Sequence, residues 1–522
     1  LAGDASQTGD ANVAVGYLSF SSVATGDNNT AIGSRSMFSN TSGSENTGLG
    51  KDALYSNTVG LYNTAIGEGA LYSNVDGSRS VAVGRLALYT QDPASAVDMY
   101  NVGVGYNAGG AVTTGIQNTL IGGLAGDAIT TGQYNVAIGV DALSVEDTAS
   151  KSVAVGTSAL AVQNAGTVDA YNVAVGHNSG VNVTTGVNNT LIGGLAGDAL
   201  TTGADNVAIG INALGAADTS NRNVAIGRAA LGAYNPSGNE DGYHVAIGYD
   251  ALTTNSTATQ NTAVGGLTLR ASTTGNLNTA VGYSAGTAVT TGQYNTTMGG
   301  FAGDALTDSD GNVAVGTWAL SADTLGSRST AIGFYALEAQ NFTTATNSYN
   351  TAVGYQAGAA VTTGVENNLI GGLAGDALTV GSYNQVLGVA ALSADTKGSR
   401  SIAIGHAALL SQNFTTATDA YNVAVGHNAG LGITTGIRNT LIGSLAGDAL
   451  TDADFNVAVG SHALTTDTKG SKSIAIGHSA LENQNFTTAT ETYNVAIGDN
   501  AGVAITTGVG NTLIGGLAGD SL

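Results

Sequence analysis

The side chains best suited to chemistry in this sequence are six histidines, and their positions argue against a reactive centre. His177, His406, His427 and His478 each follow a glycine that closes a short motif, so they occupy one position of a repeat. The sequence has no cysteine, and the histidines have no recurring carboxylate partners. Metal centres and activated nucleophiles need such groups held close together. We therefore expect no enzymatic activity, no metal and no cofactor, and we nominate no catalytic residue.

Aspartates also recur, but as part of the same repetition. A calcium site needs several oxygen ligands at short, fixed spacing. Only Asp308 and Asp310 before Gly311 come near that pattern, and they do so once. The recurring aspartates follow the phrase Leu/Phe-Ala-Gly and are Asp127, Asp198, Asp304, Asp376, Asp448 and Asp520.

A third set of candidates lies in a segment that reads Gln-Asn-Phe-Thr-Thr-Ala-Thr at residues 340–346, 412–418 and 484–490. Each copy belongs to a unit of the repeat that is longer than its neighbours, so it should bulge sideways. The bulges could bind glycans or neighbouring fibres, or their phenylalanines could fold back and seal a gap between chains; the second interpretation is favoured. The candidate residues of these lateral binding loops are Asn341, Phe342, Asn413, Phe414, Asn485 and Phe486.

A tyrosine stripe is a related candidate. Tyrosine precedes the recurring motif at many positions, and it could form an adhesive surface or cover the edge of the fold; covering is favoured. These tyrosines are Tyr62, Tyr134, Tyr171, Tyr294, Tyr349, Tyr383, Tyr421 and Tyr493.

Composition restricts the functional class. The net charge is −23, with only 14 Lys and Arg scattered over 522 residues, which disfavours a nucleic-acid partner. No apolar run reaches the roughly 20 residues of a membrane span. With 78 Gly, 2 Pro and 43% hydrophobic residues, the chain resembles neither collagen nor a disordered segment. The absence of Cys is a weak indication of an extracellular protein.

The elements that must position these residues follow from an internal repeat. The pentad Asn-(Thr/Val)-Ala-(Ile/Val)-Gly occurs 29 times, counted by its closing glycine. A 17-residue step separates most closing glycines, as at Gly16, Gly33 and Gly50, and the other steps are three or four positions longer. Four units form a super-repeat of about 72 residues, marked by Gly354, Gly426 and Gly498. Such a short period is typical of solenoids.

Each unit reads as one coil of a parallel β-solenoid. The pentad alternates and is β-branched, which favours a short strand, and the glycine permits a sharp bend. A second apolar run and a polar turn such as Thr113-Thr114-Gly115 then close the circuit. We predict an all-β solenoid, or β-roll, of 29 coils, with 17-residue coils and a 21-residue coil every fourth. Residues 1–522 are expected to form one continuous array.

Two interpretations of the leading asparagine stay open. It is present in 23 of the 29 coils. Stacked side chains could form a hydrogen-bonded ladder along the array, or asparagine could merely suit the turn before the strand.

The strand pattern also predicts a partner chain. The residue before each closing glycine is always Val, Ile, Leu or Met, so we expect it to face the core. Its neighbour, Ala14 or Ala31 for example, should face the other way, and it is never charged. A solenoid strand has one interior, so further copies of the chain should cover the second face, and a homotrimer is expected.

The repeats resemble those of two families. Residues 422–426 (Asn-Val-Ala-Val-Gly) and 473–477 (Ser-Ile-Ala-Ile-Gly) resemble the head repeats of trimeric autotransporter adhesins. The 17-residue step, with residues 63–67 followed by Ala-Leu-Tyr-Ser-Asn at 70–74, is even more similar to repeats of phage tail fibres and related bacterial fibre proteins. The resemblance covers essentially the whole chain. It implies a homotrimeric β-roll on a virion or bacterial cell surface, with a glycan or host receptor as ligand.

Two departures limit what can be carried over from these families. Adhesin heads have shorter coils, so handedness and cross-section do not transfer. No chaperone domain, stalk or anchor is recognisable, and the sequence starts and stops in the same phase of the repeat. We therefore expect either a segment of a longer array or a unit that continues end to end.

The expected function is therefore that of a structural fibre or shaft in an extracellular or virion attachment appendage. The alternative is a self-assembling extracellular filament. An ice-binding solenoid is less favoured because the recurring Thr pairs vary along the chain.

Overall fold

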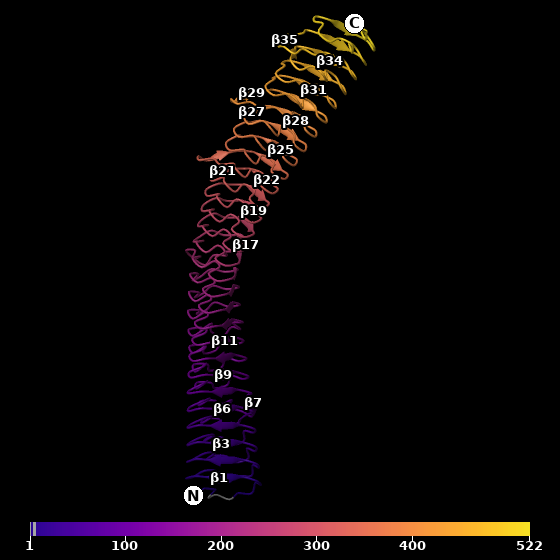
Figure 1. Ribbon diagram of the computed structural model, residues 1–522. Helices are drawn as coiled ribbons and strands as arrows, with labels where there is room; N and C mark the ends of the chain where they lie inside the picture. Colours follow the sequence, from indigo (N-terminus) through magenta and orange to yellow (C-terminus); the bar gives the residue numbers. More distant parts are fainter. Residues whose placement is uncertain (1, 4–6, 522) are drawn as a thin grey trace. The chain divides into compact units, whose positions relative to one another are not determined.

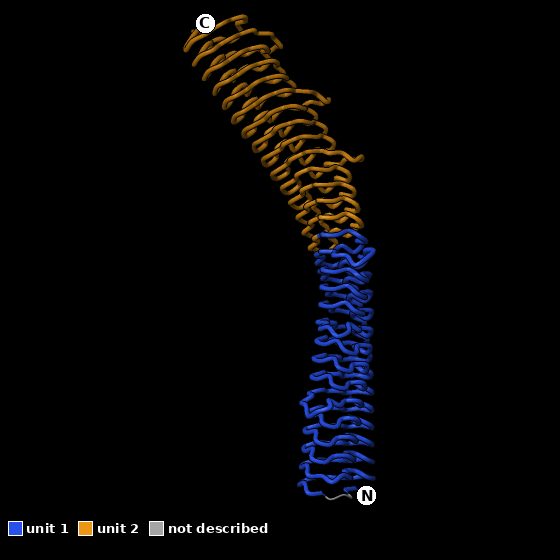
Figure 2. Tube along the Cα trace, turned by 180° about the vertical axis from the view of Figure 1, so that it is seen from behind, with its two compact units in different colours: residues 1–261 blue, residues 262–522 orange. Residues whose placement is uncertain are grey.

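The computed structural model describes residues 2–3 and 7–521, and the chain divides into two compact units, residues 1–261 and 262–522 (Figure 2). Among the described residues every regular element is a β-strand, and most strands have three residues (Figure 1). The prediction of an all-β parallel solenoid with 17-residue coils is confirmed. That the two units form one continuous array stays a prediction.

Fourteen three-residue strands build the sheet of unit 1. They are β1 (Val13–Val15), β2 (Thr30–Ile32), β3 (Thr47–Leu49), β4 (Thr64–Ile66), β6 (Val81–Val83), β8 (Val102–Val104), β9 (Thr119–Ile121), β10 (Val136–Ile138), β11 (Val153–Val155), β12 (Val173–Val175), β13 (Thr190–Ile192), β14 (Val207–Ile209), β15 (Val224–Ile226) and β16 (Val245–Ile247).

Fifteen strands of the same kind build the sheet of unit 2. They are β17 (Thr262–Val264), β18 (Thr279–Val281), β19 (Thr296–Met298), β20 (Val313–Val315), β22 (Thr330–Ile332), β24 (Thr351–Val353), β25 (Asn368–Ile370), β26 (Gln385–Leu387), β28 (Ile402–Ile404), β30 (Val423–Val425), β31 (Thr440–Ile442), β32 (Val457–Val459), β34 (Ile474–Ile476), β36 (Val495–Ile497) and β37 (Thr512–Ile514).

Neighbouring coils pair in parallel and in register. Val136 of β10 pairs with Val153 of β11, one 17-residue step further along the chain. Longer coils absorb their extra residues outside the strand, since Val153 pairs with Val173 and Val224 with Val245. The pentads therefore lie above one another whatever the length of the intervening loop.

The orientation of the strand is opposite to the one that the pattern suggested. The middle residue points inward: Ala137 and Leu441 are completely buried. The residue before the closing glycine points outward, and Ile138 and Ile442 are 36% and 40% exposed. The expectation that this residue faces the core is therefore wrong. The coil is so thin that its interior holds mainly Ala and Leu from the strand and from the second apolar run.

Side chains of complementary size fill this thin interior. Where the strand points Leu120 inward, the opposite run carries Gly126, on which a Cβ atom would lie 2.7 Å from Leu120 Cδ2. Where the strand points Ala137 inward, the opposite run carries the buried Leu143. Close packing of this kind makes each coil depend on a matched pair of residues.

The leading asparagines form the predicted ladder. Asn439 is buried, and its Oδ1 accepts a hydrogen bond from the backbone N–H of Asn456 at 3.0 Å. Its Nδ2 donates to the carbonyl of Ala453 at 2.8 Å. The pattern recurs along both units, for example from the backbone N–H of Asn135 to Asn118 Oδ1 at 3.0 Å. Each asparagine thus satisfies backbone groups that would otherwise be buried without a partner.

One histidine replaces an asparagine in the ladder and reproduces its contacts. His244 is buried. Its Nδ1 accepts the backbone N–H of Asn261 at 3.2 Å, and its Nε2 lies 2.6 Å from the carbonyl of Ala258. Only the neutral ring, protonated on Nε2, satisfies both contacts. Burial lowers the pKa of His244 to about 4.

We expect this histidine to make unit 1 sensitive to acid. An unfolded chain takes up a proton at His244 near pH 6.5 but the folded chain only near pH 4, so stability falls as the pH drops through that interval. The loss amounts to about 3 kcal/mol at most. Urea unfolding of unit 1 at pH 7 and pH 4 should show a smaller acid loss for His244→Asn than for the wild type. An equal loss in both proteins would contradict the assignment.

Candidate functional site

The outward face of each sheet is the first candidate surface. We call the first and third residues of the three-residue strands the outward stripe. Among the described strands none of these residues is charged, and the third is always Val, Ile, Leu or Met. In unit 2 the exposed fractions are 37% for Ile404, 40% for Ile442 and 36% for Ile476. A row of half-exposed aliphatic side chains this long is unusual for a protein surface in water.

The lateral bulges are the second candidate surface. Each long coil of unit 2 forms a short parallel pair with the coil before it, beside the main sheet, and the loop that precedes the second strand of the pair projects from one side of the stack (Figure 2). The pairs of unit 2 are β21 (Gly326–Ser327) with β23 (Thr346–Asn347), β27 (Gly398–Ser399) with β29 (Thr418–Asp419), and β33 (Gly470–Ser471) with β35 (Thr490–Glu491); unit 1 has β5 (Gly77–Ser78) with β7 (Val97–Asp98).

The phenylalanines of the bulges turn inward, against the coil that precedes them. Phe342, Phe414 and Phe486 are only 5–7% exposed. A Cβ atom on Gly398 would lie 2.9 Å from the ring of Phe414, so the glycine leaves the room that the ring occupies. The rings therefore fold back against their own chain, as expected, and that they also seal a gap between chains stays a prediction. The described side chains that the bulges present to solvent are therefore polar or small.

A buried carboxylate holds each bulge in place. Asp395 Oδ1 accepts the backbone N–H groups of Gly398 at 2.9 Å and Phe414 at 3.3 Å. Asp395 Oδ2 accepts Gln412 Nε2 at 2.6 Å, and the same nitrogen donates to Ser401 Oγ at 3.1 Å. The contacts recur at Asp323 and Asp467. The aspartate and the glutamine therefore have a structural role at the bulge. The sequence analysis did not predict this role.

The asparagines of the bulges stay on the surface. Asn341, Asn413 and Asn485 are exposed, and their Oδ1 atoms accept hydroxyl groups of the preceding coil: Thr324 at 3.1 Å, Thr396 at 3.1 Å and Thr468 at 3.3 Å. That a ligand binds at these bulges stays a prediction.

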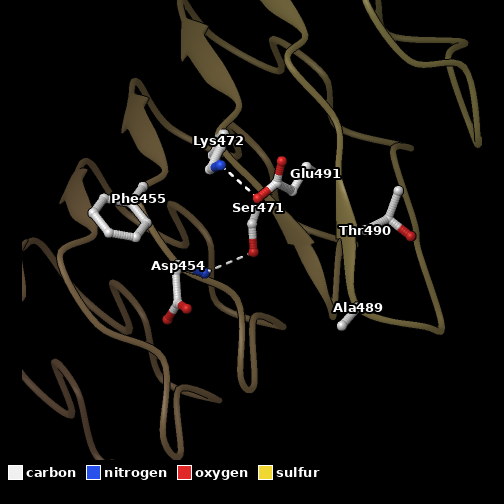
Figure 3. Close-up of a pocket in the computed structure, with 7 residues that line it drawn as sticks. All are labelled: Asp454, Phe455, Ser471, Lys472, Ala489, Thr490 and Glu491. Atoms are coloured by element: carbon white, nitrogen blue, oxygen red, sulfur yellow. Dashed lines mark hydrogen bonds and ion pairs between the residues drawn. The ribbon is translucent and has the colours of Figure 1, made fainter.

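A groove lies between the last bulge of unit 2 and the neighbouring coil (Figure 3). Its volume is about 280 Å³. The Phe455 ring and Asp454 line one side of it, and Ala489 and Thr490 line the other. Ser471 and Lys472 complete the lining together with Glu491.

A cluster of a cation, an acid and a tyrosine borders this groove. Lys472 Nζ donates to Glu491 and, at 3.2 Å, to Tyr493 Oη, while the Tyr493 hydroxyl donates to Glu491 Oε2 at 2.6 Å. These contacts raise the pKa of Lys472 and lower the pKa of Glu491. Arg400, Asp419 and Tyr421 form the corresponding cluster one super-repeat earlier, and in unit 1 the residues are Lys151, Asp169 and Tyr171. Because the clusters are exposed, they add little stability.

The predicted tyrosine stripe is exposed rather than packed over an edge. Tyr294, Tyr421 and Tyr493 are all exposed. Each has a left-handed backbone conformation, with φ of 61°, 52° and 50°, and each lies two residues before a strand of the main sheet. Several of the rings contact an arginine, as Tyr383 contacts Arg400 at 5.1 Å.

The sequence interpretation missed the aromatic stacks. Phe38, Tyr55, Tyr72 and Tyr89 of unit 1 stack in successive coils with centroids 5.0–5.2 Å apart. In unit 2 Trp318 stacks between Phe301 and Tyr335 at 5.7 and 5.2 Å. The 17-residue spacing of these aromatic residues was the signal that could have revealed them.

The recurring Thr pairs use part of their hydrogen-bonding capacity within the chain. The first hydroxyl of a pair donates to the backbone of the next coil, as Thr113 donates to Thr130 at 3.2 Å and Thr434 to Thr451 at 3.2 Å. An ice-binding role for these residues stays a prediction.

No cluster of three or more metal-binding side chains occurs in the part of the chain that the structure describes. His406 and His427 stack on one another at 5.3 Å. Burial raises the pKa of the recurring aspartates Asp127, Asp198, Asp304 and Asp448. That the chain is not an enzyme and needs no cofactor stays a prediction.

Within residues 2–3 and 7–521 no helix is long and apolar enough to span a membrane. No protein-family model matches the sequence, and no curated protein is significantly similar to it.

Proposed function

We propose that the protein is the shaft of an extracellular or virion attachment fibre in which three copies of the chain associate through their outward stripes. The proposal starts from the parallel β-solenoid, a fold that is compatible with a structural, fibre-like role. The observation that carries the association is the uncharged, half-exposed aliphatic surface along the main sheet.

The extent of this surface supports association. Nine of the fifteen third-position residues of unit 2 are 36–70% exposed, and the other six are intermediate in burial. Together they leave on the order of 1,000 Å² of stripe in water, compared with roughly 800 Å² that each partner contributes to a typical stable interface. The absence of charge on the stripe matters because copies of a chain with a net charge of −23 repel one another electrostatically. The stripe is therefore a part of the surface on which two copies can approach with little local electrostatic repulsion.

A pair of substitutions on the stripe tests the association. We expect the wild-type chain to have the mass of three chains in light scattering coupled to size-exclusion chromatography. Ile404→Asp with Ile442→Asp should give single chains, because two carboxylates per chain would be buried without partners.

The matched control adds the same charge away from the stripe. Thr415→Asp with Thr487→Asp places two carboxylates on the exposed bulges and should leave the mass unchanged. Circular dichroism must show that all variants keep their β-structure. A wild-type chain that is monomeric at micromolar concentration would overturn the proposal.

The bulges, with the groove beside the last of them, are the part of the shaft that we propose for contact with surface glycans or a host receptor. The groove combines the Phe455 ring with the carboxylates Asp454 and Glu491 and the hydroxyl of Thr490. A neutral sugar can stack its C–H face on a ring and donate its hydroxyls to carboxylates. Retention of the full chain on immobilised neutral glycans, lost in Phe455→Ala, would support this assignment, and retention that Phe455→Ala leaves intact would contradict it.

A further inference from the structure

Two carboxamide side chains interrupt the outward stripe of unit 2 in neighbouring coils. Asn368 in β25 and Gln385 in β26 occupy the first strand position, where the other described three-residue strands carry Val, Ile or Thr. Both side chains are exposed, and Asn368 Nδ2 donates to Gln385 Oε1 at 2.6 Å. Ile370, Leu387 and Ile404 border a groove of about 390 Å³ beside the pair. We call Asn368 and Gln385 the polar notch.

The repeat itself shows that a coil does not need these carboxamides. One super-repeat later the same positions hold Thr440 and Val457, and one super-repeat earlier they hold Thr296 and Val313. All four lie in strands that pair in the same register as β25 and β26. The polar notch is therefore a local departure from the repeat whose reason lies outside the coil.

An otherwise uniform stripe leaves the alignment of associated chains undetermined. Successive coils present nearly the same Thr, Val and Ile side chains at the same spacing. A copy that slips by one coil, or by a super-repeat of four coils, would lose only the contacts at its ends. Pairing that is specified so weakly is prone to slippage.

We propose that the polar notch sets the axial register in which copies of the chain associate, an inference that rests on the association proposed above. A carboxamide has two donors and two acceptor lone pairs, and the contact between Asn368 and Gln385 uses only part of them. In register, the notches of neighbouring copies meet and can satisfy one another. In any slipped alignment they would be buried against Val, Ile or Thr, which penalises that alignment. A single buried asparagine specifies the register of coiled coils for the same reason.

Cysteine cross-linking tests the register, and the chain offers a clean background because it has no cysteine. Val425→Cys places a thiol on the stripe, where copies in register can form a disulfide between identical positions. We expect the variant Asn368→Thr with Gln385→Val, which restores the repeat, to keep the oligomeric mass. Its Val425→Cys cross-link should fall at least twofold.

Moving the notch provides the matched control. Adding Thr440→Asn and Val457→Gln to the variant without a notch should restore the Val425→Cys cross-link. When chains with the moved notch are mixed with chains that carry the original one, the two should associate with an offset of one super-repeat. Val353→Cys on the original chain should then cross-link to Val425→Cys on the moved-notch chain.

The outcomes separate this inference from the proposed function. A monomeric wild-type chain would overturn the association itself. An oligomeric wild type whose Val425→Cys cross-link is unchanged by removing the notch, and whose alignment does not follow the moved notch, would overturn the register assignment alone.

Discussion

Replacing Gly371 by alanine should destabilise unit 2 by at least about 3 kcal/mol. Gly371 closes the pentad of β25 at φ +133°, a conformation that L-residues rarely adopt. A Cβ atom there would also lie 2.5 Å from the carbonyl oxygen of Gly388 in the next coil, and backbone cannot move away as a flexible side chain could. Because coils contact mainly their neighbours, the damage should be local. Amide hydrogen exchange in β25, β26 and β28 should accelerate by about 100-fold.

The neighbouring glycine is the control for this prediction. Gly372 has no other atom within 4 Å of an added Cβ and has no positive φ. Gly372→Ala makes the same chemical change one residue away and should alter the free energy of unfolding by less than about 0.5 kcal/mol. Equal effects of the two substitutions would show that the closing glycine has no special conformational role.

Replacing a ladder asparagine by leucine should be nearly as damaging. Asn439→Leu keeps the volume but leaves the N–H of Asn456 and the carbonyl of Ala453 buried without partners. It also removes the contact from Asn439 Nδ2 to Asn422 Oδ1 at 3.3 Å. At roughly 1–3 kcal/mol for each unsatisfied group, we expect a loss of about 3 kcal/mol. Urea denaturation of the full chain provides the measurement.

An exposed asparagine in the same unit serves as the comparison. Asn413 lies on a bulge and accepts the hydroxyl of Thr396. Asn413→Ala should lower the free energy of unfolding by no more than about 0.5 kcal/mol. If Asn439→Leu were as mild as Asn413→Ala, the ladder would not be what holds neighbouring coils together.

Much of the fold could be predicted because the repeat exposes it directly. The 17-residue spacing of Gly33 and Gly50 identified the coil, and Asn439 and Asn456 recur at the position where a ladder forms. Because every coil repeats the same pattern, a correct interpretation of one coil extends to the others. Less of the candidate site could be predicted. Asn341 and Phe342 marked the bulge, but nothing in their types indicated that Asp323 and Gln340 hold it.

By itself, the sequence determined the secondary structure class, the coil length, the parallel register and the places where long coils project. Only the tertiary structure decided which side of each strand faces inward. Alternation separates the middle residue of a strand, such as Leu441, from Thr440 and Ile442, but it does not say which side has an interior. The thin coil decides this, because its interior accommodates one matched pair, such as Leu441 with Gly447. The bulkier β-branched row is therefore left outside, and that row is the surface from which the proposed association follows.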